Sequence, residues 1–347
     1  MAIISFPLLP LFGQFITDGA KGKRTKPNGE YIKPQTLRQY ENTYKLLIRF
    51  CGKHSFLWRI YDYQKLTKRE RIAEANYWKK FERLFTAYLH TEREAHDNYT
   101  AYVFKQLKTF FHYLNKQKLI DTGPYFKLFK IIKQEIPVTA LSRENLLQLI
   151  YDKQFEESLP ENLQVSKDMF VFGCTCALRF SDLMLLKPSN VEQVNEEWYV
   201  KTQSKKTRAM QSIKLPVYAV DIALKYHSSR KRFLFPRIAL FNFNLHLKKI
   251  GQAMELTHLV SKSRSKMGLV KTDRQTEVPF FETMSSHLMR RTAITNMLTL
   301  GMPENLVKHI SGHAGDSKSF HRYVAYSQTY MNGELDKVYE KMKQSKL

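Results

Sequence analysis

The chain has 347 residues, which is too long for one typical domain and suits two domains that each bury an apolar core. Hydrophobic residues make up 43% of it and aromatic residues 13%, which excludes a largely disordered protein. The 56 Lys and Arg outnumber 32 acidic residues, and a formal charge of +24 destabilises a compact chain unless a polyanion lies against it. We therefore expect a nucleic-acid partner rather than a generally basic, soluble surface.

The positive charge is unevenly distributed along the chain. Residues 201–274 contain 17 Lys and Arg but only 3 Asp and Glu, a net charge of +14. More than half of the excess charge therefore lies in about a fifth of the sequence, which favours a dedicated DNA-contacting surface.

Neither the cysteines nor the apolar opening segment indicates secretion, a metal or a membrane. Cys51, Cys174 and Cys176 are odd in number and lack CxxC spacing, so we expect no disulfide framework and no structural metal, and a reducing cytoplasm fits. Pro7 and Pro10 interrupt the opening MAIISFPLLPLFGQFI, which has no charged n-region, and this argues against a signal peptide or membrane span. We expect this segment to pack on the first domain.

The first third of the chain is predicted to be helical, because apolar residues recur there at helical spacing. They are Leu37, Tyr40, Tyr44, Leu47 and Cys51, and later Val103, Leu107, Phe110 and Leu114. Between these two sets, residues 66–90 are charged and rich in aromatic residues. Their Lys and Arg are compatible with phosphate contacts and equally with a solvated helix face.

A domain boundary is predicted where the helical pattern breaks. The sequence QEIPVTA, residues 134–140, contains a proline, and Ser142 then resembles a helix N-cap with Glu144 in the first turn. We therefore divide the chain into an N-terminal helical domain, residues 1–136, and a second domain, residues 137–347.

The second domain is predicted to be mostly helical with one short β element. Residues 198–200 and 212–216 are β-prone and flank the polar run KTQSKKTRAMQ, which suggests a hairpin. Ser285 or Ser286 can cap a helix that Gly301 ends, and Pro303 can open another helix that closes near Gly312.

Several polar residues of this domain have an ordinary structural explanation when each is taken alone. Arg179 could form a buried ion pair with Asp182, and Lys206 could be a turn lysine. His287 could cap a helix, and Tyr323 could be a core aromatic. Their order and spacing along the chain favour a catalytic set instead.

The segment CALRFSDLMLLKPSNV resembles the first signature box of the tyrosine recombinase, or phage integrase, family, in which an arginine is followed three residues later by an acid. These residues are Arg179 and Asp182 here. The next segment, KKTRAMQSIKLP, is similar to the family's β-hairpin lysine element, which ends in a leucine and a proline. Counting back from Leu215 favours Lys206 as the catalytic lysine, with Lys205 as the alternative.

Two further segments complete the resemblance. SSHLMRRTAITNMLTLG resembles the second box, His-x-x-Arg at the start of a helix, and supplies His287 and Arg290. His313 follows in SGH at the family's spacing from Arg290, and Tyr323 lies ten residues further on, in the position of the nucleophile. The match extends from about residue 141 to 330, whereas the first domain matches only in size, helicity and position.

The sequence departs from the family pattern in three places. Cys176 and Ala177 replace the small glycine usual before the first arginine, and Met289 replaces the usual leucine before Arg290. The interval from His313 to the nucleophile is one residue longer than the commonest form, which leaves Tyr326 as a minor rival to Tyr323.

The resemblance implies a fold that is mainly α with a small β element (α+β). A helical, SAM-like core-binding domain and a tyrosine recombinase catalytic domain would clamp double-stranded DNA. Four protomers would assemble on two recombination sites and exchange strands through a 3′-phosphotyrosyl intermediate and a Holliday junction. No metal or other cofactor is implied, and accessory DNA-bending factors are conceivable partners of such an integrase of a mobile element.

The residue types suit this chemistry independently of the family. A tyrosine that forms a phosphate ester keeps the bond energy, which assigns Tyr323 as nucleophile. Arg179 and Arg290 can bind the charged phosphate oxygens with fixed planar donors. His287 and His313 can donate to the same oxygens or help to move the tyrosine proton, and this division stays open.

The remaining candidates support leaving-group departure and DNA binding. Lys206 is the expected general acid for the 5′-oxygen. Asp182 either orients an arginine or histidine or is purely structural. We expect Lys205, Arg208 and Arg291 to contact DNA.

Two alternative functions remain at this point. A type IB topoisomerase-like enzyme uses a similar tyrosine, arginine and histidine constellation but relaxes a single duplex. A catalytically inactive DNA-binding protein would keep the basic surface without the chemistry.

Overall fold

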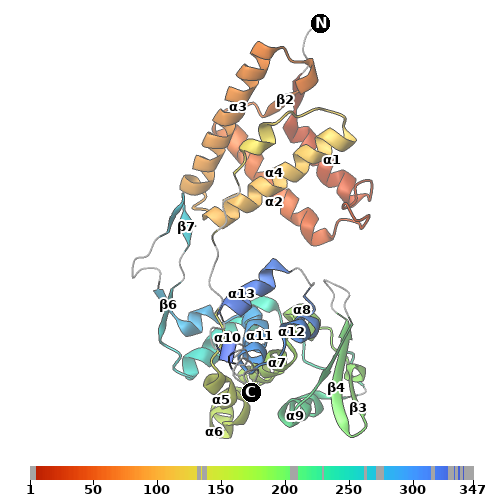
Figure 1. The fold of residues 1–347 in the computed structure, drawn as a ribbon, viewed down its shortest axis with the longest axis vertical. Coiled ribbons are helices and arrows are strands. Elements are labelled where there is room, and N and C mark those ends of the chain that lie inside the picture. Colours follow the sequence, from red (N-terminus) through yellow and green to blue (C-terminus); the bar gives the residue numbers. More distant parts are fainter. Residues whose placement is uncertain are drawn as a thin grey trace. The chain divides into compact units, whose positions relative to one another are not determined.

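The computed structural model describes residues 5–130, 134, 139–203, 210–228, 230–261, 264–270, 277–313 and 317–326, together with 332, 335, 336 and 339. These residues form two compact units, which Figure 1 draws. The first unit comprises residues 5–134 with 264–270, and the second comprises residues 139–261 with those from 277 onward. The predicted fold class, mainly α with a small β element, is confirmed.

The first unit is helical with two short antiparallel strand pairs. Its elements are β1 (Ser5–Pro7), α1 (Leu8–Ala20), α2 (Pro34–Lys53), β2 (Arg59–Tyr61), η1 (Tyr63–Lys65), α3 (Lys68–Ala87), the π-helix η2 (Tyr88–Glu92), α4 (Asp97–Gln117), η3 (Tyr125–Leu128), β7 (Ser265–Lys266) and β8 (Leu269–Val270). The apolar repeats predicted to be helical lie in α2 and α4, so both predictions are confirmed.

The opening segment packs on the first unit, as predicted. Leu8, Phe12 and Phe15 of α1 are completely buried, and the Phe12 ring lies 4.7 Å from that of Phe110 in α4. Most of residues 66–90 form α3, which begins with a capping box between Thr67 and Glu70. Aromatic side chains make up most of this core, and all four helices contribute some of them, because each ring buries a large apolar area.

A hairpin from the second half of the sequence belongs to the first unit. β7 and β8 pair antiparallel through a turn in which Met267 and Gly268 both have positive φ. The buried Asp97 carboxylate, at the start of α4, accepts hydrogen bonds from the backbone N–H groups of these two residues, at 2.8 and 3.0 Å. The hairpin lies within the range 137–347 that the sequence assigns to the second domain, yet its contacts are with α4.

The second unit contains most of the later helices and a three-stranded sheet. Its elements are α5 (Arg143–Tyr151), α6 (Lys153–Ser158), α7 (Glu161–Cys176), α8 (Phe180–Leu183), η4 (Pro188–Asn190), β3 (Val191–Val194), β4 (Glu197–Gln203), β5 (Met210–Lys214), α9 (Val217–Tyr226), α10 (Leu240–Ala253), β6 (Leu259–Ser261), β9 (Glu277–Pro279), η6 (Phe280–Thr283), α11 (Ser286–Thr299), α12 (Glu304–Ser311) and α13 (Lys318–Tyr326).

Helix α7 is the centre of the second unit. It packs against α5, α9, α10 and α11, and most of its residues from Ser166 to Cys176 are buried. Its second half, Met169–Cys176, is mostly apolar on every side, as expected of a helix surrounded by others, whereas Lys167 and Asp168 are buried charges. Cys174 and Cys176 are buried free thiols in this helix, and burial raises the pKa of both.

The predicted β-hairpin is present as β4 and β5, and β3 extends it to an antiparallel sheet in the order β3-β4-β5. Side chains alternate between the two faces of the sheet, as the strand period of two requires. Val200 and Ile213 are buried on the inward face, and Thr202 and Gln211 lie on that same face as a cross-strand pair. The residues between the strands, 204–209, lie outside the described part of the chain.

The predicted helix boundaries hold, with one correction. Ser142 caps α5 by accepting a hydrogen bond from Asn145 N, and Gly312 ends α12 in the left-handed conformation. Helix α11 begins at Ser286, but the Ser285 side chain makes no capping hydrogen bond. Instead, Asn244 of α10 accepts a hydrogen bond from Ser286 N at 2.8 Å, so a neighbouring helix supplies the cap.

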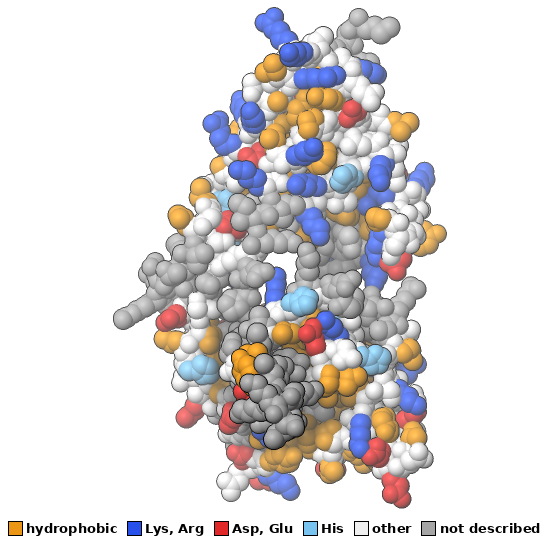
Figure 2. Space-filling model, viewed as in Figure 1, with side chains coloured by type: hydrophobic (Ala, Val, Ile, Leu, Met, Phe, Trp, Pro, Cys, Tyr) orange, Lys and Arg blue, Asp and Glu red, His pale blue; other side chains and the backbone are white. Residues whose placement is uncertain are grey.

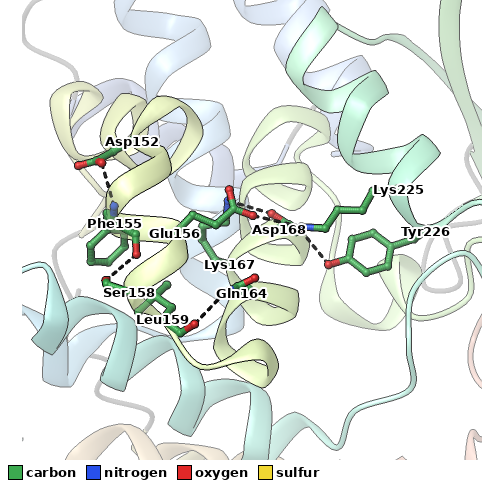
Figure 3. Close-up of polar contacts among 10 residues, drawn as sticks. All are labelled: Asp152, Phe155, Glu156, Ser158, Leu159, Gln164, Lys167, Asp168, Lys225 and Tyr226. Atoms are coloured by element: carbon green, nitrogen blue, oxygen red, sulfur yellow. Dashed lines mark hydrogen bonds and ion pairs between the residues drawn. The ribbon is translucent and has the colours of Figure 1, made fainter.

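A buried charge network joins α6, α7 and α9 (Figure 3). The Asp168 carboxylate accepts hydrogen bonds from Lys225 and from the Tyr226 hydroxyl, both at 2.8 Å, and lies 2.9 Å from Lys167 Nζ. Burial alone would raise the pKa of Asp168, but the hydrogen bonds from Lys225 and Lys167 lower it below its usual value. Lys167 also donates to Glu156, so every charge in the network has a partner.

We expect Asp168→Asn to lower the free energy of unfolding at neutral pH by about 3 kcal/mol, because Lys225 and buried Lys167 are then left with one carboxylate, Glu156, between them. The folded-state pKa of Asp168 is depressed, so its contribution is present above the unfolded-state pKa of about 3.9 and is lost as pH falls through the folded value. Urea unfolding should show a constant difference from wild type down to about pH 5 that shrinks below about pH 4. Exposed Asp221 of α9 is the matched control, and Asp221→Asn should change stability by less than about 0.5 kcal/mol. A difference for Asp168→Asn that is equal at both ends of this range would contradict the assignment.

Candidate active site

The first arginine lies where α7 ends and α8 begins. Ala177 ends α7 with φ 51° and ψ 25°, a left-handed conformation that favours glycine. Glycine is the usual residue here in the family that the sequence resembles. The chain then extends, and Arg179 becomes the residue preceding α8. Its guanidinium lies 3.9 Å from the buried Asp182 carboxylate, one turn further along. Asp182 thus faces Arg179, which suits an orienting role.

The second arginine is almost completely buried in α11. Arg290 is 2% exposed, and its Nη1 donates a hydrogen bond to the Ala177 carbonyl at 3.0 Å. This contact ties α11 to the end of α7. Burial and the nearby charge of Arg179 lower the pKa of Arg290 to about 10, and the electrostatic effects of Tyr323 and Asp182 oppose this shift. Arg290 therefore remains charged at neutral pH, and Arg179, Tyr323 and Asp182 lie within electrostatic range of it.

His313 follows the last turn of α12 and contacts Arg290. Arg290 Nη2 lies 3.1 Å from His313 Nδ1 and 3.3 Å from Nε2, and Ser311 Oγ lies 2.8 Å from Nδ1. Ser311 donates its single hydroxyl hydrogen to the Val307 carbonyl at 2.6 Å, so its oxygen is left to accept a proton from Nδ1. Ser311 and Arg290 therefore both contact the His313 ring and limit how it can turn. Ser311 was not among the residues that the sequence singled out.

Tyr323 lies on α13 beside this pair. It is 5% exposed, and its ring centroid is 6.1 Å from that of His313 and 6.0 Å from that of Phe320. A small apolar cluster holds it in place, and its buried members are Ala177, Ala293, Ile294, Leu298, Val307, Phe320 and Tyr323. The same cluster therefore packs α13 against α11, α12 and the end of α7.

The structure brings together five of the six predicted catalytic positions in one unit, four of them in close proximity. His287 is the exposed second residue of α11, three positions before Arg290 and so on the same side of the helix. Arg291 is half-buried on the same helix. Lys205, Lys206 and Arg208 lie outside the described residues, as does the side chain of Tyr326. Their predicted roles stay predictions.

This arrangement suits the transfer of a phosphoryl group to a hydroxyl. Arg179 and Arg290 are both charged and can bind the same phosphate, because a planar guanidinium matches two phosphate oxygens at once. His313 adds a polar group at the same place, and Tyr323 offers a phenol oxygen beside it. Among the described residues, no group of three or more His, Cys, Asp or Glu side chains could hold a metal ion.

Most of the second unit lies within a match to a known family. Residues 148–329 match the model described as "Phage integrase family", which spans more than half of the chain. No curated protein matches the sequence. No helix among the described residues has the length and apolar character needed to cross a membrane.

Solved structures with the same fold cover nearly the whole chain. XerH site-specific recombinase bound to palindromic difH substrate, in a post-cleavage complex, is 11% identical with a TM-score of 0.60, covering 96% of each chain. The Tn1549 transposon integrase in complex with a circular intermediate DNA is 14% identical with a TM-score of 0.62, covering 97% of this chain and 100% of the other. Lambda integrase bound to DNA is 15% identical with a TM-score of 0.55, covering 94% of this chain and 96% of the other.

Proposed function

The chain belongs to the phage integrase family, and from that premise we propose that Tyr323 attacks a DNA phosphate and holds the cut strand as a phosphotyrosyl ester. The protein is a tyrosine site-specific recombinase, an enzyme that breaks and rejoins DNA strands. The observation that supports this assignment of the nucleophile is the proximity of Tyr323, His313 and Arg290 where α7, α11, α12 and α13 meet.

Each step of the proposed reaction uses a named group. The Tyr323 oxygen bonds to phosphorus, and the bond from phosphorus to the 5′-oxygen breaks, so the 3′-phosphate stays on the tyrosine. Lys206 gives a proton to the departing 5′-oxygen, which leaves as a hydroxyl. Attack by the 5′-hydroxyl of another strand reverses these events and rejoins the DNA without an external energy source.

The other proposed catalytic residues stabilise the transition state, orient one another or move the phenol proton. Arg179 and Arg290 bind the non-bridging oxygens, where charge gathers in the transition state. Asp182 orients Arg179, since its carboxylate faces that guanidinium. His287 and His313 between them donate to the same oxygens and take the phenol proton. The contacts of His313 with Arg290 and Ser311 support a fixed position for its ring.

The charge of both units supports double-stranded DNA as the partner. Residues 1–130 contain 24 Lys and Arg and 11 Asp and Glu, and Figure 2 shows basic side chains spread over the viewed face of the first unit. We assign residues 1–136 as a core-binding DNA-binding domain and residues 137–347 as the catalytic domain, with Lys205, Arg208 and Arg291 on phosphates. The protein would act in the cytoplasm as the integrase of a mobile element, with accessory DNA-bending factors as further partners.

An adduct-trapping experiment tests this function against its alternatives. The full chain is incubated with DNA from both flanks of its own gene, and protein-linked DNA is isolated after denaturation. We expect a covalent adduct at a defined sequence and the joining of two such sites. Relaxation of a single supercoiled duplex without a defined site would favour a type IB topoisomerase, and binding without any adduct would favour an inactive DNA-binding protein.

A tetramer on DNA is the assembly that we propose, with the C-terminal tail as the connecting element. In the tail, residues 331–347, the apolar residues Leu335, Val338 and Met342 recur at helical spacing. Leu335 and Tyr339 are exposed, whereas Val338 and Met342 lie outside the described residues. The second unit has an apolar groove of about 640 Å³, lined in part by Ile150, Met297, Leu300, Met302 and Leu306. We propose that the tail of one protomer docks in this groove of the next, a head-to-tail contact that closes into a ring.

Truncation before Met331 should keep binding to a single site but remove synapsis and strand exchange, because it deletes only the docking segment. Mobility shift measures the first property and junction formation on paired sites measures the second. Leu306→Asp, which places a charge in the proposed acceptor groove, should reproduce the defect in the full-length chain. If the truncated protein recombines at the full-length rate, the tail is not an assembly element.

A further inference from the structure

Gln211 joins the sheet to the helix that precedes His313. Its side chain lies on the inward face of β5 and is 5% exposed. The amide nitrogen donates a hydrogen bond to the Ile310 carbonyl at 2.7 Å and makes a weaker one to the His309 carbonyl at 3.5 Å. These residues are 99 and 98 positions apart in sequence, so the contact exists only in the folded unit.

The carbonyls that Gln211 contacts belong to the last turn of α12, where helical carbonyls lose their intrahelical partners. The same turn leads into Gly312, whose φ of 59° redirects the chain, and then into His313. The backbone N–H groups of Gly312 and His313 donate to His309 and Lys308, at 3.0 and 2.9 Å. Gln211 therefore contacts the turn that sets the direction of the His313 backbone.

The backbone of Gln211 belongs to β5, a strand of the hairpin predicted to carry the proposed general acid. It pairs across the strands with Thr202, and the next pair, Gln203 with Met210, is the last before residues 204–209. Lys206 follows Gln203 by three residues in sequence and lies outside the described part of the chain. The position of the hairpin base thus limits where the lysine can be.

We propose that Gln211 is a positioning residue for catalysis, which fixes the base of the lysine hairpin to the end of α12. The inference rests on the proposed function. The Gln211 amide links the strand next to the Lys206 segment to the turn that precedes His313. His313 in turn contacts Arg290 on α11. Gln211 touches neither DNA nor the reacting atoms in this account, and it acts through Lys206.

The test compares two leaving groups on the recombination site mapped for this protein. Adduct formation is timed on a duplex with the natural 5′-bridging oxygen and on one with a 5′-bridging sulfur, which leaves without needing a proton. We expect Gln211→Leu to slow the oxygen reaction on the order of tenfold, as loss of one buried hydrogen bond implies, and the sulfur reaction by no more than about twofold. A partly unfolded sample would lose the same fraction of its activity on both substrates. The ratio of the oxygen rate to the sulfur rate therefore reports the position of the general acid rather than the folded fraction.

A double-mutant cycle and a matched control complete the design. If Gln211 acts through the lysine, Gln211→Leu combined with Lys206→Ala should be no slower than Lys206→Ala alone. Lys205→Ala serves in the same cycle for the alternative lysine, and coupling to either lysine supports the proposal. The control is Thr202→Val, which alters the cross-strand partner on the same buried face and should keep the wild-type rate on both substrates.

Three results would overturn the inference. They are an equal slowing of Gln211→Leu on both substrates, no slowing on either, and effects that multiply independently with those of both lysine variants. In each case the wild-type protein still forms its adduct, so only the role of Gln211 fails. If the wild-type protein forms no adduct on either substrate, the proposed function itself fails, and the inference about Gln211 fails as well.

Discussion

Tyr323→Phe is expected to abolish the covalent protein–DNA adduct while leaving DNA affinity within about twofold of wild type, because binding rests on many phosphate contacts and bond storage on one oxygen. The substitution removes only the hydroxyl, and the ring keeps its contacts with His313 and Phe320. Adduct formation is measured by denaturing electrophoresis and affinity by mobility shift at fixed salt.

The control for this prediction is Tyr326→Phe, which changes the neighbouring tyrosine that the longer spacing leaves as a rival. We expect this variant to form the adduct at the wild-type rate. An adduct that persists in Tyr323→Phe and disappears in Tyr326→Phe would move the nucleophile by three residues, one turn along α13.

Arg290→Ala and Lys206→Ala should both slow cleavage strongly but differ in their response to a sulfur leaving group. Loss of Arg290 removes charge stabilisation from the transition state, at a cost of roughly a hundred- to a thousandfold in rate by analogy with a lost oxyanion donor. Sulfur does not replace that charge, so the defect of Arg290→Ala should remain. The defect of Lys206→Ala should largely vanish, since a thiolate leaves without a proton. If sulfur rescues neither Lys206→Ala nor Lys205→Ala, the general acid lies elsewhere.

The buried charge of Arg290 allows a control for folding. Burial lowers the pKa of this guanidinium, which means that the folded chain holds the charge at a cost in the absence of DNA. We therefore expect Arg290→Met, which keeps the volume and removes the charge, to unfold within about 1 kcal/mol of wild type in urea while remaining inactive. A large loss of stability would mean that the rate defect reflects folding rather than chemistry.

Several candidate site residues lie in segments whose local structure could be predicted, because the order and spacing of residues there are informative. Arg290 and His287 are three positions apart on one helix, and Gly312 ends the helix before His313, so local rules place these side chains. Helical periodicity in the same way located α2 and α4. Residues 66–90 kept two interpretations, because a basic helix face has the same pattern whether it contacts phosphate or solvent.

Contacts between segments that are distant in sequence could not be predicted from local patterns. Neither the hydrogen bond from Arg290 to the Ala177 carbonyl nor the one from Gln211 to Ile310 leaves a sequence pattern, since each depends on the packing of separate elements. The β7–β8 hairpin was missed for the same reason. Its strands are only two residues long, too short to show a period of two, and its partner Asp97 lies about 170 residues earlier.

The most direct test of the account is to identify the amino acid that is joined to DNA. The trapped adduct is digested with a protease and a nuclease, and the peptide that keeps a nucleotide is sequenced by mass spectrometry. We predict a single modified peptide with the 3′-phosphate esterified to Tyr323. A nucleotide on any other residue, Tyr326 included, would contradict the assignment of Tyr323 as the nucleophile.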